Sequence, residues 1–161
     1  MRTQFPLRWQ ASIIAVLLFA NVSVYRAVFA APTLTITVAT AGKGSMAVIR
    51  APGGETILVD TGPDASALRA LGTALPPWQR HLSAIILTGG KAAQTGGLGI
   101  VQSRYSVGSI TRFGSAATPY GSSLAFGPAI LATLAPGQTT LLYRSVAFII
   151  SSSTPPGTYS L

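Results

Sequence analysis

The sequence predicts a mixed α/β domain preceded by one hydrophobic helix. Three observations indicate this: an apolar run lies near the N-terminus, segments with strand periodicity dominate from residue 33 onward, and short helical segments separate several of them. Strands that alternate with short helices favour a layered α/β arrangement. A length of 161 residues fits one domain plus a short appendage. We therefore divide the chain into an N-terminal segment, residues 1–31, and a domain, residues 32–161.

The N-terminal segment resembles an export or anchoring signal. Residues 11–20 are apolar apart from Ser12, and Arg2 and Arg8 precede them. Basic residues before an apolar run favour a cytoplasmic N-terminus. We therefore expect the domain to lie on the extracytoplasmic side.

Three alternatives remain for this segment. A transmembrane signal-anchor needs about 20 mostly apolar residues, which residues 9–31 provide if Asn21 and Arg26 are tolerated. A cleaved signal peptide has a shorter apolar run followed by small residues, for which Val28-Phe29-Ala30 is the candidate site. A helix in the core of a soluble protein is the third alternative. The anchor is preferred.

Downstream of Pro32, which cannot continue a helix, the chain shows strand and helix patterns. Polar and apolar residues alternate over residues 33–38, as in a half-buried strand. Asp64 is the expected cap of the first helix, because its carboxylate can accept hydrogen bonds from the free amides of the first turn. The predicted strands are 33–38, 46–50, 56–59, 82–87, 107–113, 129–134, 140–143 and 146–150, and the predicted helices are 65–74 and 98–105.

Composition limits the chemistry. The formal net charge is +8, from 11 Lys and Arg against 3 acidic residues. Because the basic residues are scattered singly, they do not form the cluster that marks a dedicated nucleic-acid patch. The chain has no cysteine, which excludes disulfides and thiolate zinc sites.

Three segments carry a resemblance to a known family. They are LTITVATAGKGS (34–45), VIRAPGGETILVDTGP (48–63) and IILTGGKAAQTGGLGIVQSRY (85–105). In this order they resemble the metallo-β-lactamase-like domain of ComEC-type competence proteins, whose segments contain DVGQGD, LIDxGP and LTHPHADHIGGL. The resemblance covers residues 33–113, with a fainter likeness at 145–161 that stops short of the family's final Gly-Asp.

The resemblance implies an αββα sandwich of the metallo-β-lactamase type. In it, two β-sheets pack face to face and helices cover the outside. It implies a domain that is incomplete at its C-terminus and follows a membrane segment, in agreement with the N-terminal pattern.

In the family, the segment THPHADH binds divalent metal ions. A bound metal lowers the pKa of water so that hydroxide can attack a phosphodiester. The corresponding residues here are Thr88-Gly89-Gly90-Lys91-Ala92-Ala93-Gln94. The resemblance therefore places Gly89, Lys91, Ala93 and Gln94 where the family has its metal ligands.

The other residues do not replace these ligands. A protonated Lys91 cannot coordinate a metal, and the acids of DVGQGD correspond to Thr40 and Ser45. Since the chain has one histidine and three acids, no conventional metal site is expected. We assign no catalytic, cofactor or metal residue, and treat Asp60, Thr88, Gly89, Lys91, Ala93 and Gln94 as vestigial site positions.

Asp60 and Lys91 each have two alternative roles, whereas one role is expected for His81. Asp60 is either a vestigial supporting acid or a cap of the turn at Thr61-Gly62. His81 is expected to be an exposed loop residue. Lys91 is either a solvated loop lysine or, with the backbone amides of its glycine-rich loop, an anion contact.

Together these observations predict a non-catalytic, membrane-associated domain related to competence and DNA-uptake proteins, without a cofactor. Its expected partners are the membrane, through the N-terminal helix, and DNA or a DNA-uptake channel protein. The alternatives are a nuclease-like, metal-dependent hydrolase with ligands from a partner, and a secreted binding protein.

Overall fold

The computed structural model describes residues 7–28, 33–151 and 153–161. The chain divides into two units, Met1–Pro32 and Thr33–Leu161. In the first, helix α1 spans Leu7–Val28. Among the described residues, no helix combines the length and the apolarity that crossing a membrane requires. Arg2, the predicted cleavage site at Phe29 and Ala30, and Pro32 lie outside the described residues.

The second unit contains a six-stranded sheet in the order β10-β1-β2-β3-β4-β5. Its strands are β1 (Thr35–Ala41), β2 (Gly44–Arg50), β3 (Thr56–Val59), β4 (His81–Leu87), β5 (Ser106–Arg112) and β10 (Gly157–Ser160). The pairs β10–β1, β1–β2 and β2–β3 are antiparallel, whereas the pairs β3–β4 and β4–β5 are parallel. The carboxyl ends of β3 and β4 therefore meet at one edge of the sheet.

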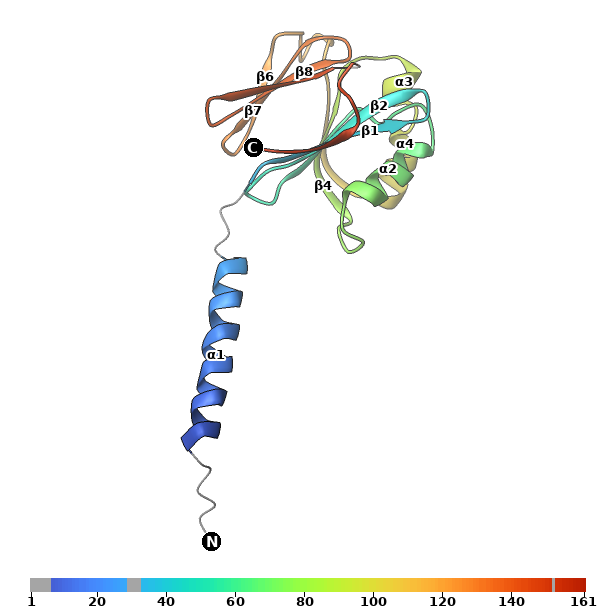
Figure 1. Ribbon diagram of the computed structural model, residues 1–161. Helices are drawn as coiled ribbons and strands as arrows, with labels where there is room; N and C mark the ends of the chain where they lie inside the picture. The colour runs from blue at the N-terminus through green and yellow to red at the C-terminus, as the bar shows by residue number, and fades with distance from the viewer. Residues whose placement is uncertain (1–6, 29–32, 152) are drawn as a thin grey trace. The chain divides into compact units, whose positions relative to one another are not determined.

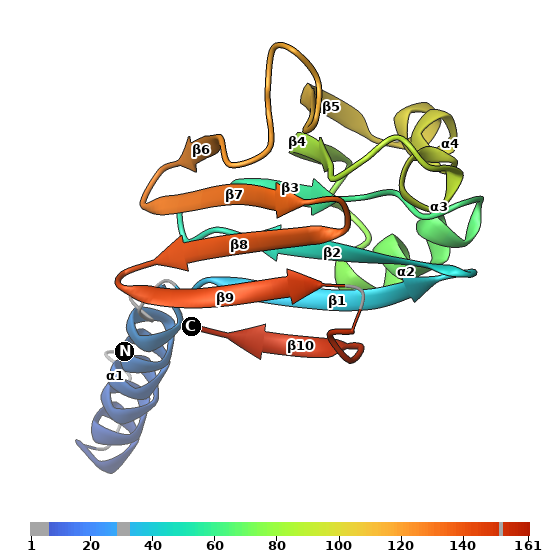
Figure 2. The ribbon, with the colours of Figure 1, turned by 90° about the horizontal axis from the view of Figure 1, so that it is seen from above.

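A second sheet of four antiparallel strands, β6-β7-β8-β9, lies against the first (Figure 2). Its strands are β6 (Ser123–Phe126), β7 (Ala129–Ala135), β8 (Gln138–Tyr143) and β9 (Val146–Ser151). Buried and exposed residues alternate along β7, where Leu131 is fully buried and Ile130 is 42% exposed. One face of this sheet thus contributes to the core, and the other, with Ile130, Leu142 and Ile149, is exposed and apolar.

Helices α2 (Ser66–Ala74), α3 (Ala92–Thr95) and α4 (Leu98–Arg104) lie on the other side of the six-stranded sheet (Figure 1). The period of two along the strands explains this layering. In β3, Ile57 and Val59 join the core between the sheets, whereas Leu58 joins the core beneath the helices. Apolar residues at successive positions of β3 and β4 therefore bury both faces of the central sheet.

The predicted strands and both predicted helices are present, but three short elements were missed. These are β6, α3 and β10, each of four residues. Strand β10 exists through its pairing with β1, in which Gly157 lies opposite Val38. Asp64 accepts a hydrogen bond from the Ser66 amide at 2.8 Å. The helix begins one residue later than predicted, however, so its cap is Ala65 and Asp64 lies one residue before the cap.

Candidate functional site

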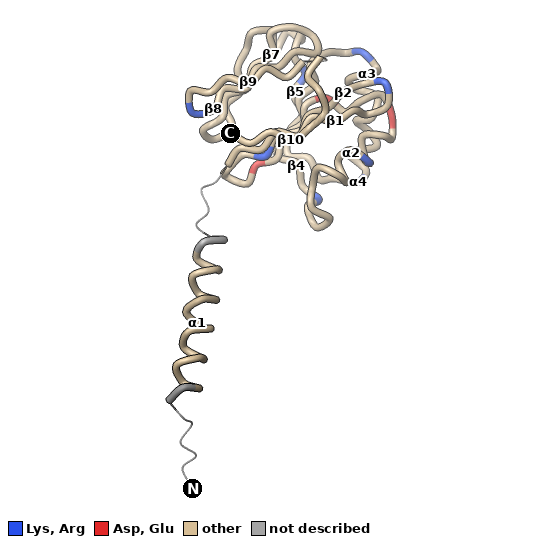
Figure 3. Tube along the Cα trace, in the orientation of Figure 1, with Lys and Arg blue, Asp and Glu red and all other residues tan. Residues whose placement is uncertain are grey.

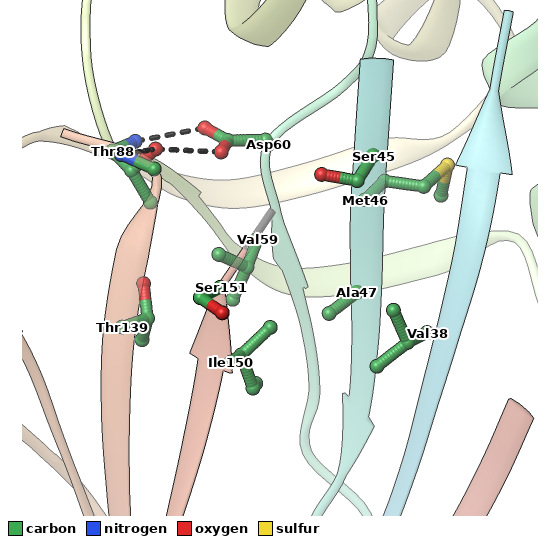
Figure 4. Close-up of a pocket in the computed structure, with 11 residues that line it drawn as sticks. Val38, Ser45, Met46, Ala47, Val59, Asp60, Thr88, Thr139, Ile150 and Ser151 are labelled. Atoms are coloured by element: carbon green, nitrogen blue, oxygen red, sulfur yellow. Dashed lines mark hydrogen bonds between the residues drawn. The ribbon is translucent and has the colours of Figure 1, made fainter. Parts of the chain in front are cut away.

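The candidate site begins at the carboxyl ends of two parallel strands. Asp60 follows β3 and Thr88 follows β4, and the parallel pairing brings them together. Asp60 Oδ1 accepts a hydrogen bond from the Thr88 amide at 2.8 Å, and Oδ2 accepts one from Thr88 Oγ1 at 2.6 Å (Figure 4). Both residues are buried. Both carboxylate oxygens of Asp60 are therefore engaged within the protein.

The hydroxyl of Thr88 extends this network. Thr88 Oγ1 accepts hydrogen bonds from Gln94 Nε2 at 3.1 Å and from the Gly137 amide at 3.0 Å. A hydroxyl has one donor and two acceptor positions, so all of them are used. Gln94 Oε1 in turn accepts a hydrogen bond from the Lys91 amide at 3.2 Å. The network thus joins Asp60 to the segment that resembles the family's metal motif.

Burial has a clear effect on Asp60. Desolvation raises the pKa of its carboxyl to about 6, although the side-chain and backbone hydrogen bonds from Thr88 lower it. Asp60 also has a positive φ of 57°, a conformation that aspartate tolerates better than most residues. Its position therefore combines a costly buried charge with an uncommon backbone geometry.

The expectation that Asp60 caps the turn at Thr61-Gly62 is wrong. Its hydrogen bonds come from Thr88, on the neighbouring strand. The amide and hydroxyl of Thr61 donate instead to the backbone carbonyl of Gln94, at 2.8 and 3.0 Å. The supporting role is the alternative for Asp60 that agrees with this geometry.

Close backbone contacts hold the loop after β4 against the turn after β3. A Cβ atom at Gly96 would overlap the carbonyl oxygen of Pro63, and one at Gly97 would overlap that of Thr61. Only glycine allows this approach. The double glycine therefore fixes the segment that carries Lys91 and Gln94 next to Asp60.

A pocket of about 410 Å³ opens at this edge of the sheet. Its lining residues are Thr40, Gly42, Lys43, Gly44, Ser45, Asp60, Lys91, Ala93, Gln94 and Gly137. Thr88 lines a smaller cavity of about 20 Å³ that shares Ser45, Asp60 and Gly137 with the pocket and has room for one water molecule (Figure 4). Gly89 is next to the Gln94 side chain: a Cβ atom at Gly89 would lie 2.5 Å from Gln94 Oε1. The structure thus brings the six vestigial positions together.

His81 is not part of this site. It is the first residue of β4, at the opposite end of the strand from Thr88, and not a loop residue as expected. It is exposed, and its Nδ1 lies 3.5 Å from Ser106 Oγ. Lys43 was not predicted as a site residue, yet it lines the pocket together with Lys91. Its only signal was the Gly42-Lys43-Gly44 turn inside the family-like segment.

The residues of the pocket do not fit a divalent metal ion. Within the described residues, no group of three or more His, Cys, Asp and Glu side chains is placed to hold one. Asp60 is the sole acid that lines the pocket, and Thr88 engages both its oxygens. The two lysines add positive charge, which repels a cation.

Comparison with known proteins identifies the fold. No family model and no curated protein matches the chain. A solved metallo-β-lactamase from Cronobacter sakazakii, a HARLDQ motif mutant, matches with a TM-score of 0.52 and 16% identity, over 70% of this chain and 60% of that one. A peroxy diiron species of the chemotaxis sensor ODP matches with a TM-score of 0.47 and 15% identity, over 69% of this chain and 55% of that one. The match to the metallo-β-lactamase shows that the chain has a metallo-β-lactamase-like fold. The chain spans less than two thirds of the length of both proteins.

Proposed function

We propose that this chain is a non-catalytic, metallo-β-lactamase-like domain related to ComEC-type competence proteins, and that its metal site has been lost. The Asp60–Thr88 pair carries the proposal. The one acid of the pocket accepts two hydrogen bonds from Thr88. The sequence resemblance aligns Lys91 with one of the family's metal ligands. A scaffold of this kind can keep its fold after its chemistry has gone.

The placement of the family-like segments supports the relationship. The first forms β1 and the turn into β2, the second contains β3, and the third contains the end of β4 together with α3 and α4. Although they are separated in the sequence, all three reach the same pocket, through Ser45, Asp60 and Lys91. Segments that share one pocket are expected if they derive from one site.

Export of the domain is part of the proposal. It rests on Arg2 and Arg8 before the apolar residues of α1. DNA or a channel protein would then meet the domain outside the cytoplasm. Lys and Arg positions are spread over the domain (Figure 3), which favours weak contacts with DNA over a sequence-reading patch. Protease added to intact spheroplasts should digest the domain. A protected domain would refute export, and sequencing the N-terminus would show whether cleavage occurs before Ala31.

Metal analysis tests the loss of the site. The full chain, purified in a non-ionic detergent, is incubated with Zn²⁺ or Mn²⁺, dialysed and assayed for metal and for cleavage of single-stranded DNA. We expect substoichiometric metal and no cleavage above a blank. Stoichiometric metal, together with cleavage that a chelator abolishes, would overturn the proposal.

Restoring the family's metal ligands tests whether this loop can regain zinc binding. The combined substitutions Gly89→His, Lys91→His, Ala93→Asp and Gln94→His return the family's motif to its loop. Because a zinc site needs at least three protein ligands, this variant should gain zinc binding, whereas Lys91→His alone should not. A folded combined variant that binds no more zinc than the parent would contradict the assignment of this loop as the former metal site.

A further inference from the structure

We propose that the pocket binds a phosphate-type oxyanion between Lys43 and Lys91. This inference goes beyond the loss of metal chemistry, because it assigns the pocket a ligand of opposite charge. Lys43 lies in the turn between β1 and β2, and Lys91 lies directly before α3. Both line the pocket of about 410 Å³, which is larger than a phosphate ion requires and admits a phosphate ester.

Close packing fixes the two lysine-bearing segments relative to one another. A Cβ atom at Gly44 would lie 2.5 Å from the carbonyl oxygen of Ala93 and 3.1 Å from Pro63 Cδ. Since Gly44 follows Lys43 and Ala93 is two residues after Lys91, the two segments are in contact at their backbones. The fold thus brings the two lysine-bearing segments to the same pocket.

The charge balance of the pocket favours an anion. Within the described residues, no ion pair engages Lys43 or Lys91. The carboxylate of Asp60 lines the same pocket, but it accepts both of its hydrogen bonds from Thr88 and is buried. Asp64 lies near the turn, 3.2 Å from a Cβ built on Gly42, and is exposed and outside the pocket lining.

The remaining lining residues suit an oxyanion. Thr40 and Ser45 contribute hydroxyl groups, and neither is charged. Each ammonium group has three donors, and hydrogen bonds from charged donors to phosphate oxygens are stronger than neutral ones. Two ammonium groups and two hydroxyls can together satisfy several oxygens of one phosphate group.

The test measures binding of inorganic phosphate, and of sulfate as a second oxyanion, to the full chain in non-ionic detergent at low ionic strength. Titration calorimetry gives the affinity, and amide shifts of residues 42–45 and 91–94 locate the site. Lys43→Gln and Lys91→Gln should each weaken binding by roughly three- to tenfold, the size of a lost charge contact near a protein surface. Arg104→Gln, at the exposed end of α4, removes the same charge outside the pocket and should leave the affinity unchanged.

Asp60→Asn should change the phosphate affinity in the opposite direction from the lysine substitutions. Removing its negative charge from the pocket should strengthen phosphate binding several-fold. No saturable binding, shifts confined to other residues, or equal weakening by Arg104→Gln would overturn the inference. Binding that needs added Zn²⁺ and disappears with a chelator would overturn it as well and would also contradict the loss of the metal site, whereas absent phosphate binding would leave that loss intact.

Three further arms distinguish the source of the phosphate group. Dimethyl phosphate represents a diester, a short oligothymidylate represents single-stranded DNA, and phosphatidylglycerol vesicles represent a lipid surface. Each arm supports the inference if Lys43→Gln and Lys91→Gln weaken binding more than Arg104→Gln does. The arm with the highest affinity identifies the source.

Discussion

Asp60 and Thr88 form a closed pair across the ends of β3 and β4, in which one carboxylate accepts both the amide and the hydroxyl hydrogen of one threonine. The pair is buried, so water cannot replace a lost partner at low cost. It also connects Gln94 and Gly137 through the same hydroxyl. Substitutions at this pair should therefore change both the stability of the protein and the pKa of Asp60.

Replacing Thr88 by valine should destabilise the protein. The change removes the hydroxyl and leaves Asp60 Oδ2 without this hydrogen bond, at a cost of about 1–3 kcal/mol in the free energy of unfolding. Because the Thr88 hydroxyl lowers the pKa of Asp60, the variant should also raise this pKa further. Urea unfolding and an NMR titration measure the two effects. Thr88→Ser keeps the hydroxyl and should show little change in the pKa, and equal effects of both substitutions would contradict the account.

Asp60 should make the protein less stable as the pH rises. Its pKa is about 6 in the folded state against an ordinary 3.8, so the folded state binds the proton more tightly. This contribution is fully present below pH 3.8 and is lost as the pH rises to about 6. The difference corresponds to on the order of 3 kcal/mol. Unfolding of Asp60→Asn should lack this decline, and an unchanged slope would contradict the prediction.

Asp64 serves as a control, because its contribution to stability should depend on pH in the opposite direction from that of Asp60. Its pKa is lowered below 3.8, chiefly by hydrogen bonds with Ser66. Its stabilising contribution is therefore present above pH 3.8 and is lost as the pH falls through the lowered pKa. Asp64→Asn should alter the pH profile only in this acidic range and should leave the decline up to pH 6 in place.

The glycines of the loop after β4 offer a matched pair of substitutions. Gly96→Ala places a Cβ atom onto the carbonyl oxygen of Pro63, and overpacking of this kind typically costs about 1–3 kcal/mol. Gly99, in α4, has open space around its Cβ position, so Gly99→Ala should stabilise the helix by up to about 1 kcal/mol. Thermal unfolding should move in opposite directions. A destabilised Gly99→Ala, or an unaffected Gly96→Ala, would refute this packing.

Neighbouring residues of β7 should contribute unequally to the free energy of unfolding. Leu131 is fully buried between the sheets and Ile130 is 42% exposed. Leu131→Ala should cost about 2–5 kcal/mol, and Ile130→Ala should cost much less. Chemical denaturation of both variants provides the measurement. Equal losses would mean that the outer face of this sheet is covered in solution.

Local patterns predicted the strands and helices that have enough apolar residues to define a period. The strands 56–59 and 82–87 are predominantly apolar, which is the pattern of strands buried on both faces of a sheet. Helix α3 was missed because Ala92–Thr95 is too short to show a period. Strand β10 was missed because it depends on pairing with β1, far away in the sequence.

The site was predictable only in part, for the same reason. The resemblance identified Asp60 and the segment 88–94, but it did not predict that Asp60 pairs with Thr88 of that segment, 28 residues further along the chain. Local turn chemistry suggested a cap, whereas the parallel pairing of β3 and β4 supplied Thr88. Lys43 joined the pocket through the contact between Gly44 and Ala93, which no local pattern encodes.

The most direct test of the central claim is an NMR titration of the Asp60 carboxyl carbon in the full chain, with and without excess Zn²⁺. If Thr88 holds this carboxylate and no metal site remains, its pKa should lie near 6 in both titrations. Coordination of a metal favours the ionised carboxylate. A pKa that falls well below 6 when Zn²⁺ is added, and returns with a chelator, would contradict the account.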